Sequence, residues 1–231
     1  MKILVKFPTR SRPEKFLSTL KGYIDNTVGV ATVDYLITCD SDDPTMNADV
    51  IKRIQWMTDR ATINHGSSTS KIHAINRGMA QYKEHWDIVV LASDDMICVQ
   101  HGWDQIIADT MAYHFPDTDG GLWFWDGDHQ TRRNGLCTMN IMGRKYYERF
   151  GYLYHPSYVS LWCDNEYTEV GKRLNKLPFF DQVLFKHVHF SNTPGQAPDE
   201  LMRKTQSYFK QDMVNYHNRH AKGFDLHEGN R

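Results

Sequence analysis

Short apolar runs alternate with longer amphipathic stretches over the first hundred residues of the chain. The runs that have the length of buried strands lie at residues 2–7, 35–37, 61–64 and 88–91. Between them, apolar residues recur at helical spacing from Pro13, from Asp43-Pro44 and over residues 72–82. Asp43-Pro44 is predicted as the N-cap and first residue of its helix. This alternation predicts βαβ units, a mostly parallel sheet and therefore an α/β fold.

The second half of the chain is rich in aromatic residues, and its strand candidates are shorter. They lie at residues 122–125, 136–142 and 183–190. The last thirty residues mix charged and aromatic side chains, which predicts a terminal helix followed by a frayed tail. Because the sequence contains no linker, repeat or low-complexity tract, we expect a single domain over residues 1–231.

Composition and charge are those of an ordinary globular protein. The net charge of -1 supplies no overall field that would draw the chain to nucleic acid or a membrane. Its four cysteines form no CxxC pair and lie in apolar contexts, which predicts reduced, buried thiols. No segment approaches the roughly 20 apolar residues of a membrane span, and the N-terminal run reads as a strand. We therefore expect a soluble, cytoplasmic protein.

Polar and charged residues follow each predicted strand of the first half. They are Thr9-Arg10-Ser11-Arg12, Asp40-Ser41-Asp42-Asp43, His65 to Ser70, and Ser93-Asp94-Asp95. In an open parallel sheet, ligands bind beyond the carboxyl ends of the strands. The sequence therefore predicts a binding site at this edge of the sheet.

Three aspartate clusters are candidates for holding a divalent cation, because carboxylate oxygens suit Mg²⁺ and Mn²⁺. Asp43 is expected to be used as a helix cap, and Asp126-Gly127-Asp128 is typical of a turn. Ser93-Asp94-Asp95 directly follows the most apolar strand, which favours it. Acidic pairs at strand ends are nevertheless common without a metal.

Two further groups carry possible chemistry. His187 and His189 share one face of a predicted strand, and imidazole is a normal ligand of Mn²⁺-like ions. Asp164 and Glu166 open a stretch with helical spacing. Asp164 is interpreted either as a carboxylate that stabilises the helix N-terminus or as a general base that takes a proton from a hydroxyl.

The order of these motifs along the chain resembles that in the GT-A glycosyltransferases, most closely in glycosyltransferase family 2 and its small viral and phage-like members. The matching segments, spread over residues 1–190, are Phe7-Pro8-Thr9-Arg10-Ser11-Arg12-Pro13, Asp40, Ser70-Lys71-Ile72-His73-Ala74-Ile75-Asn76-Arg77-Gly78, Leu91-Ala92-Ser93-Asp94-Asp95-Met96, Asp164-Asn165-Glu166 and His187-Val188-His189. The resemblance implies a Rossmann-like nucleotide-sugar-binding half (1–100) with a mostly parallel central sheet, fused to an acceptor-binding half (101–195). A C-terminal helix and tail (196–231) would follow.

The resemblance also implies an activity: metal-dependent, inverting transfer of a sugar from a nucleoside diphosphate sugar, in this family commonly a UDP-sugar, to an acceptor hydroxyl. It places at the donor Pro8, Thr9, Arg10, Arg12, Asp40, Lys71, Asn76 and Asp94. An aromatic set could form a platform for a sugar ring or a flipped base, although for each member ordinary core packing is the more frequent role; it comprises Trp123, Trp125, Tyr152, Tyr154 and Trp162. Asp164 and Glu166 match the catalytic acidic motif. The expected Mn²⁺ or Mg²⁺ ligands are Asp95, Asp94 and one of His187 and His189, while the family's usual first aspartate falls on Ala92.

Two alternatives come from other classes. One is a non-catalytic sugar- or nucleotide-binding module with the same fold. The other is a sugar-phosphate nucleotidyltransferase, which the absence of glycine from Pro8 to Arg12 disfavours. The acceptor stays open between a glycan, a lipid-linked sugar, a protein, and hydroxymethylated pyrimidines in phage-type DNA. For DNA, the phosphate contacts could come from Arg132, Arg133, Arg144 and Lys145.

Overall fold

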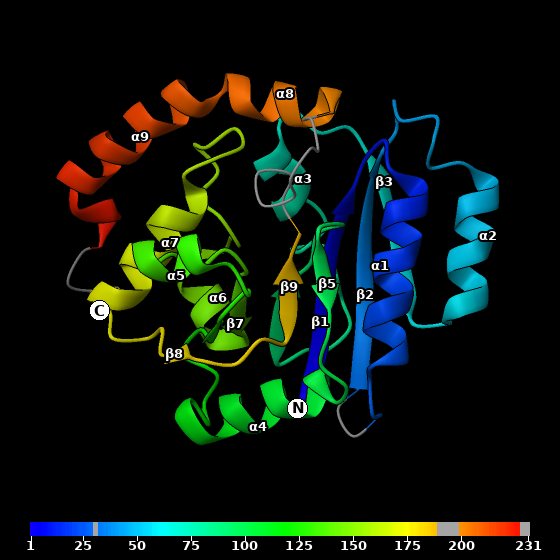
Figure 1. Cartoon of the computed structure of the whole chain (residues 1–231), viewed down its shortest axis with the longest axis horizontal. Coiled ribbons are helices and arrows are strands. Elements are labelled where there is room, and N and C mark those ends of the chain that lie inside the picture. Colours follow the sequence, from blue (N-terminus) through cyan, green and yellow to red (C-terminus); the bar gives the residue numbers. More distant parts are fainter. Residues whose placement is uncertain (30–31, 189–198, 227–231) are drawn as a thin grey trace.

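The centre of the protein is a five-stranded sheet. The computed structural model describes residues 1–29, 32–188 and 199–226. The sheet has the strand order β3-β2-β1-β4-β7 (Figure 1). Its strands are β1 (Lys2–Thr9), β2 (Thr32–Asp40), β3 (Ala61–Gly66), β4 (Ile88–Leu91) and β7 (Ile141–Gly143). The first four run parallel and β7 is antiparallel to β4, which confirms the predicted α/β fold and its mostly parallel sheet.

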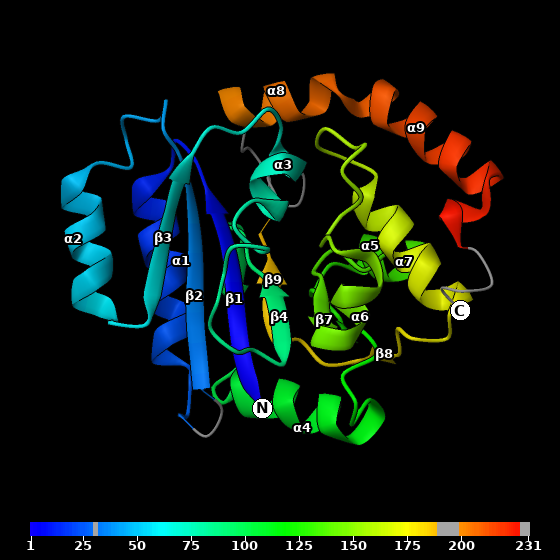
Figure 2. The same cartoon turned by 180° about the vertical axis from the view of Figure 1, so that it is seen from behind.

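Helices cover both faces of the sheet, as Figures 1 and 2 show from opposite sides. The helices are α1 (Pro13–Asp25), α2 (Ala48–Met57), α3 (Lys71–Asn76), α4 (Trp103–His114), α5 (His129–Asn134), α6 (Arg144–Phe150), α7 (Cys163–Arg173), α8 (Glu200–Ser207) and α9 (Phe209–Ala221). Alternate residues of β1 point to opposite faces: Ile3 and Val5 join the core with α1, α2 and α4, and Leu4 joins the core with α3, α6 and α7. The alternation of side chains along β1 thus contributes to two hydrophobic cores, one on each face of the sheet.

Two small sheets complete the second half of the chain. β5 (Met96–Cys98) pairs antiparallel with β9 (Phe185–His187), and β6 (Trp123–Phe124) pairs parallel with β8 (Phe179–Phe180). β6 is shorter than the predicted run 122–125, β9 begins two residues after the start of the predicted run 183–190, and β5 and β8 are not predicted. The pairing of β5 with β9 returns the chain to the end of β4.

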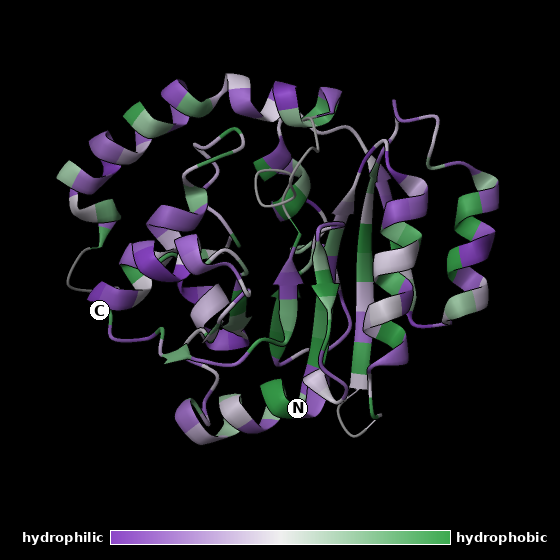
Figure 3. Ribbon diagram, in the orientation of Figure 1, coloured by the Kyte–Doolittle hydropathy of each residue, from purple (hydrophilic) through white to green (hydrophobic). Residues whose placement is uncertain are grey.

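The C-terminal helices α8 and α9 form an arch over the carboxyl edge of the sheet and over α7 (Figure 1). Hydrophobic and hydrophilic residues alternate along both helices (Figure 3), but no residue of α8 is fully buried, and in α9 the buried residue is Asp212. No helix in the described part of the chain is long and apolar enough to cross a membrane. All four cysteines are free and buried, as the sequence predicts.

Two predicted helix boundaries are wrong. Asp43 does not cap the second helix: α2 begins at Ala48, and the Asn47 side chain accepts hydrogen bonds from two of its first amides. Asp43 instead accepts a hydrogen bond from the Ser11 amide (2.7 Å). The helix predicted over residues 72–82 ends at Asn76, because the chain turns at Gly78, whose φ of +87° strains any other residue.

One charged side chain lies in the middle of the sheet. Lys6 of β1 is fully buried, and its ammonium group donates hydrogen bonds to the Thr38 hydroxyl and to the carbonyl of Arg77 (2.8 Å). Burial, together with the nearby charge of Arg77, lowers the pKa of Lys6 to about 7. The lysine thus holds the turn after α3 against the sheet while being only partly protonated near neutral pH.

We expect Lys6 to make stability depend on pH. Between pH 7 and the unfolded pKa of about 10.4, the unfolded chain binds more protons at this position than the folded protein does. The contribution of Lys6 to the free energy of unfolding therefore increases as pH rises through this window. Urea unfolding of the wild type and of Lys6→Met at pH 7, 8 and 9 tests this. The difference in unfolding free energy, wild type minus variant, should increase with pH, and a constant difference would contradict the expectation.

Candidate active site

The candidate residues gather where several elements end at one edge of the sheet. Arg10 and Arg12 follow β1, Asp40 ends β2, and Asp95 lies between β4 and β5. Because β1, β2 and β4 are parallel, these ends share one edge. The structure therefore brings together the segments that the sequence predicts as the binding edge.

Asp95 and His187 face each other across the pairing of β5 with β9. The amide of Val188 donates to the carbonyl of Asp95 (2.8 Å), which fixes the two backbones next to one another. The Nε2 atom of His187 lies 3.6 Å from Oδ2 of Asp95, and each side chain is 18% exposed. The hydroxyl of Ser93 donates to the Asp95 carboxylate. This is a half-buried carboxylate–imidazole pair at the mouth of the site.

Asp126 holds the other side of the same imidazole ring. Its Oδ2 lies 3.8 Å from Nδ1 of His187, and its carbonyl accepts a hydrogen bond from the His187 amide (2.9 Å). The carboxylate is buried and fixed by the hydroxyls of Thr131 and Thr138, each at 2.6 Å. Sequence reasoning assigned Asp126 to an ordinary Asp-Gly turn. The turn exists, with Gly127 at φ +80°, but its aspartate also faces the histidine.

The two carboxylates control the charge of the histidine. Burial alone would lower the pKa of His187, but Asp126 and Asp95 outweigh it and raise that pKa to about 9. Burial alone would raise the pKa of Asp126, but the nearby His187 and the hydrogen bonds from Thr131 and Thr138 outweigh it and lower that pKa. Without a cation, this chain therefore carries an imidazolium between two carboxylates at neutral pH.

A divalent cation fits this pair as a site of few protein ligands. Carboxylate oxygen and imidazole nitrogen are both suitable donors for Mn²⁺, and the pair is partly open to solvent. Within the described residues, no group of three or more His, Cys, Asp or Glu side chains could hold a metal ion. The remaining coordination positions would fall to substrate oxygens and water, which is usual for Mg²⁺.

The two other expected metal ligands are placed differently. Asp94 turns toward α1, where its carboxylate pairs with Arg12 (3.2 Å) and Lys15 (3.6 Å). The structure thus brings Asp95, rather than Asp94, to His187. His189 lies outside the described residues.

The donor-side residues form a chain of ion pairs along the edge. Arg10 binds Asp40 (2.9 Å) and Asp42 (2.6 Å), and Arg77 lies 3.4 Å from Asp40. Asp40 is 9% exposed, and its Oδ1 accepts no hydrogen bond from the part of the chain that the structure describes. Arg12 connects this edge to the C-terminal arch: it binds Asp94 and also Asp199, the N-cap of α8. Each arginine of this edge is therefore paired with at least one carboxylate, so the edge carries little net charge.

Four other expected donor residues differ in accessibility. Thr9 is buried and lies against the sulfur of Met46, and Pro8 is half-buried at the end of β1. The amide of Asn76 is occupied by the protein itself, because it bonds the backbone of Leu153 and Tyr154. Lys71, the first residue of α3, is exposed. Of these residues, Lys71 is the one whose side chain is free to approach a ligand.

The indole of Trp125 is held in place by its neighbours. Its N–H donates to the carbonyl of Asp128 (3.0 Å), and the Arg132 guanidinium stacks on its ring at 4.9 Å. Trp125 directly precedes Asp126 in the sequence. Trp125 is therefore a fixed aromatic surface against the start of α5, where its ring also packs against His129 (5.2 Å).

Asp164 and Glu166 share helix α7 but have different surroundings. Asp164 is the second residue of the helix, and burial raises its pKa against the favourable effects of the Asn165 amide and the charge of Lys71. Glu166 is buried and binds Arg219 of α9 through two hydrogen bonds (2.7 and 2.8 Å) and the Tyr158 hydroxyl (2.8 Å). Its carboxylate is thus fully engaged in the scaffold, which argues against the expected catalytic role.

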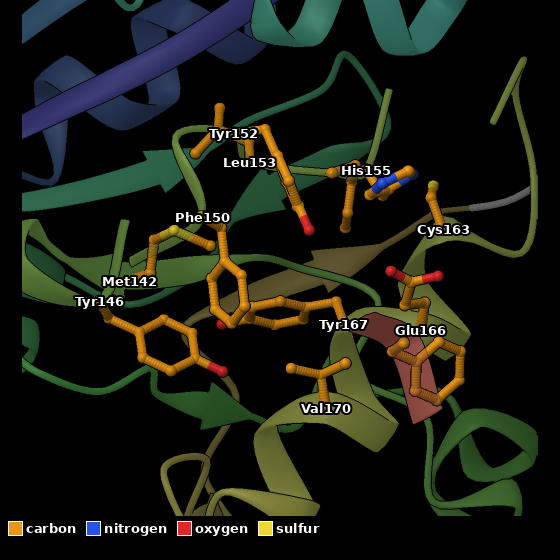
Figure 4. Close-up of a pocket in the computed structure, with 12 residues that line it drawn as sticks. Met142, Tyr146, Phe150, Tyr152, Leu153, His155, Cys163, Glu166, Tyr167 and Val170 are labelled. Atoms are coloured by element: carbon orange, nitrogen blue, oxygen red, sulfur yellow. The ribbon is translucent and has the colours of Figure 1, made fainter. Parts of the chain in front are cut away.

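An aromatic cavity lies against α7, and Glu166 is one of the residues that line it. Figure 4 shows the rings of Tyr146, Phe150 and Tyr167 gathered around it, with Glu166 at one side. Tyr152 and Tyr154, expected as part of a ligand platform, also line it, and Tyr154 is buried. These aromatic residues belong to the packing between α6, α7 and the C-terminal segment.

Comparisons with solved structures identify the architecture. The sequence matches no family model and no curated protein. The structure is similar to a mannosyltransferase, PcManGT, from Pyrobaculum calidifontis in complex with GDP-Man and Mn²⁺, with a TM-score of 0.69 and 13% identity over 96% of this chain and 64% of that chain. The protein has the GT-A fold.

Two other GT-A structures agree. S. aureus TarS matches with a TM-score of 0.62 and 13% identity over 100% of this chain and 45% of its own. Glucosyl-3-phosphoglycerate synthase from Mycobacterium tuberculosis, in complex with Mn²⁺, UDP and phosphoglyceric acid, matches with a TM-score of 0.59 and 12% identity over 93% and 78%. This chain thus spans less than two thirds of the mannosyltransferase and of full TarS. None of these three sources supports the expected likeness to viral and phage members.

We expect Asp126 to control the charge state of His187. In metal-free Asp126→Asn, one of the two carboxylates that stabilise the imidazolium is lost, so the pKa of His187 should fall from about 9 toward the ordinary value of about 6.5. NMR titration of the imidazole resonances measures this directly. Asp181→Asn, which removes an exposed carboxylate paired with Arg132, is the matched control and should leave the His187 pKa unchanged.

Proposed function

We propose that the protein is a metal-dependent glycosyltransferase that moves a sugar from a nucleoside diphosphate sugar, a UDP-sugar, to an acceptor hydroxyl with inversion of configuration. The observation that carries this proposal is the Asp95–His187 pair. It lies at the carboxyl edge of a GT-A sheet, with arginines on the β1 side and Asp164 at the start of α7. Solved structures with this fold are complexes with GDP-Man and Mn²⁺, with UDP-GlcNAc, and with Mn²⁺ and UDP-Glc.

The donor half supplies positive charge for the diphosphate and a polar contact for the nucleobase. Arg10 and Arg12 stand where the diphosphate would lie, and exchange of their present carboxylate partners for phosphate oxygens keeps their charges paired. Oδ1 of buried Asp40 makes no hydrogen bond within the described residues, although Arg77 lies 3.4 Å away, and it is suited to accept one from an N–H of a nucleobase such as uracil. Lys71, the first residue of α3, adds a positive charge on a flexible side chain.

The metal side is formed by Asp95 and His187, with Asp126 orienting the ring. When bound, Mn²⁺ or Mg²⁺ would stabilise the negative charge of the departing diphosphate as a Lewis acid. The Asp126 carboxylate lies 3.8 Å from Nδ1 of His187, on the side where a metal-ligating histidine commonly meets an orienting carboxylate. Asp126 itself is fixed by Thr131 and Thr138, so the ring orientation is set before any ligand arrives.

Asp164 is the proposed general base. A raised pKa makes a carboxylate a better proton acceptor near neutral pH, and burial at the start of α7 supplies that shift. In the transfer, the acceptor oxygen forms its bond to the anomeric carbon as the bond to the diphosphate breaks. Its proton passes to Asp164. One displacement of this kind inverts the anomeric centre.

The charges around the acceptor half favour a glycan over modified DNA. Three of the four basic residues considered as phosphate contacts are engaged by carboxylates: Arg132 by Asp181 (2.6 Å), Arg144 by Glu148 (2.6 Å) and Lys145 by Asp117 (2.7 Å). A surface paired in this way offers little net positive charge to a polyanion. An acceptor sugar hydroxyl beside Asp164 is therefore the favoured acceptor class.

The base assignment is tested by Asp164→Asn. Loss of a general base lowers the rate by about 10²–10⁴-fold, whereas donor affinity should be retained because Asp164 lies on the acceptor side. Transfer is followed by release of nucleoside diphosphate, and donor binding by thermal shift with Mn²⁺ over a panel of nucleotide sugars. A fully active variant would rule out Asp164 as the base, and a wild type that responds to no nucleotide sugar would rule out the proposed function.

Metal affinity should depend on pH through His187. With a pKa of about 9 in the metal-free protein, the ring must lose a proton before it can bind a cation. The apparent Kd for Mn²⁺ should therefore fall by about tenfold per pH unit as pH rises from 7 toward 9 and level off above it. Titration calorimetry at several pH values, with Asp126→Asn for comparison, measures the slope. The variant should reach its plateau at a lower pH.

A further inference from the structure

The segment between α6 and α7, residues 151–162, is irregular in backbone but firmly held. It is anchored by polar side chains, buried or half-buried, that come from other parts of the chain. Asn140 donates to the carbonyl of Leu153 (2.8 Å), and Asn76 bonds the backbone of Leu153 and Tyr154. These two anchors fix its first half. The second half leads directly into α7 and Asp164, and it is held by a different residue.

Asp212 of α9 anchors this second half. Its side chain is fully buried, and its carboxylate accepts three consecutive backbone hydrogen bonds, from Val159 (3.0 Å), Ser160 (2.8 Å) and Leu161 (2.8 Å). Successive amides that converge on one anion form a concave anion site, here filled by a side chain of the protein. Asp212 also lies in the first turn of α9, where the helix dipole favours a negative charge.

The same segment connects Asp212 to the donor side. While the amide of Val159 binds Asp212, its carbonyl accepts a hydrogen bond from the amide of Ile72 (3.3 Å), in the first turn of α3. Lys71 is the residue before Ile72. A single residue of the loop is therefore held from one side by α9 and from the other by the helix that carries Lys71.

Trp162 connects the anchored loop to the start of α7. It has a positive φ of 63° and serves as the N-cap residue of the helix, so the chain turns sharply there. Its ring packs against Phe209 (5.6 Å) and Tyr216 (5.3 Å) of α9. The next residues are Cys163 and Asp164. The direction in which α7 starts is thus set by contacts with the C-terminal helix.

We propose that Asp212 is a positioning residue for the transfer reaction: by holding residues 159–161, it sets the place of Asp164 relative to α3 and Lys71. This inference rests on the proposed function, because it gives Asp164 the role of base. Asp212 lies on α9 and touches the loop backbone, so it acts through that loop. The C-terminal helix is thereby part of the catalytic arrangement as well as of the fold.

The test is Asp212→Asn. An amide of the same shape offers one accepting oxygen where the carboxylate offers two, and its NH₂ group faces backbone N–H donors. We expect kcat to fall by about 10–100-fold, since small displacements of a catalytic group have effects of this size, while KM for the donor changes less than about twofold. Amide hydrogen exchange over residues 157–163 should be faster than in the wild type.

A matched control separates positioning from general damage to α9. Asp225→Asn removes an exposed carboxylate that binds Arg219, leaves the Asp212 contacts untouched and should retain wild-type kcat. Equal losses of kcat and donor affinity in Asp212→Asn would overturn the proposal, because they would indicate a general structural effect. An unchanged kcat in a folded variant with faster exchange would overturn it as well.

A second variant covers the case in which Asp212→Asn does not fold. Trp162→Leu loosens the same loop from α9 without altering a buried charge, and it should show the same fall in kcat with unchanged donor KM. Wild-type kcat in this variant would then overturn the proposal. Failure of the proposed function is a separate outcome: the wild type itself would bind no nucleotide sugar and transfer none.

Discussion

The backbone pairing of β5 with β9 is the constraint on which the candidate site depends. It joins residues 96–98 to residues 185–187, nearly ninety positions apart, directly beyond the end of β4. Through it, Asp95 and His187 become neighbours, and the carbonyl of Asp126 is drawn to the His187 amide. Three acidic or basic groups from distant segments thus meet at the mouth of the parallel sheet. The rest of the second half packs around this closure.

Buried ionisable side chains are used repeatedly to fix irregular segments, and each is held by hydrogen bonds or an ion pair to its neighbours. Lys6 holds the turn after α3, Asp126 holds the histidine ring, and Glu166 ties α7 to Arg219 of α9. Such groups are costly to bury alone: removing one partner of a buried pair costs about 3–5 kcal/mol, because the other charge is left without compensation. The Glu166–Arg219 pair therefore makes α9 a required part of the fold, although α9 lies outside the central sheet.

The first half could be predicted well from sequence because its determinants are local. The strand around Val90 is a continuous apolar run, the strand around Val5 is interrupted only by Lys6, and such runs between amphipathic helices favour a parallel sheet. Asp164 was likewise placed correctly near a helix start. The mistaken cap at Asp43 arose from a local preference that a tertiary contact overrode, since the Ser11 amide takes this carboxylate.

The site was less predictable because its decisive partners are non-local. Asp126 carries an ordinary turn signature, and only the return of β9 shows that its carboxylate faces His187. Glu166 sits in a motif typical of catalysis, yet its environment is decided by Arg219, 53 residues later. A short pattern specifies the residue type and the backbone, whereas the partner that determines its chemistry comes from elsewhere in the chain.

These features together give the C-terminal helix pair a place in the proposed reaction. The proposed general base, Asp164, must be held at a fixed distance from a donor that would lie on a different structural element. Here the sheet fixes the donor edge, while α7 begins after a loop with no regular structure of its own. Asn76 and Asn140 hold one end of that loop from the sheet side, and Asp212 holds the other from α9. The arch therefore supplies the rigidity that a short acceptor half cannot supply from its own backbone.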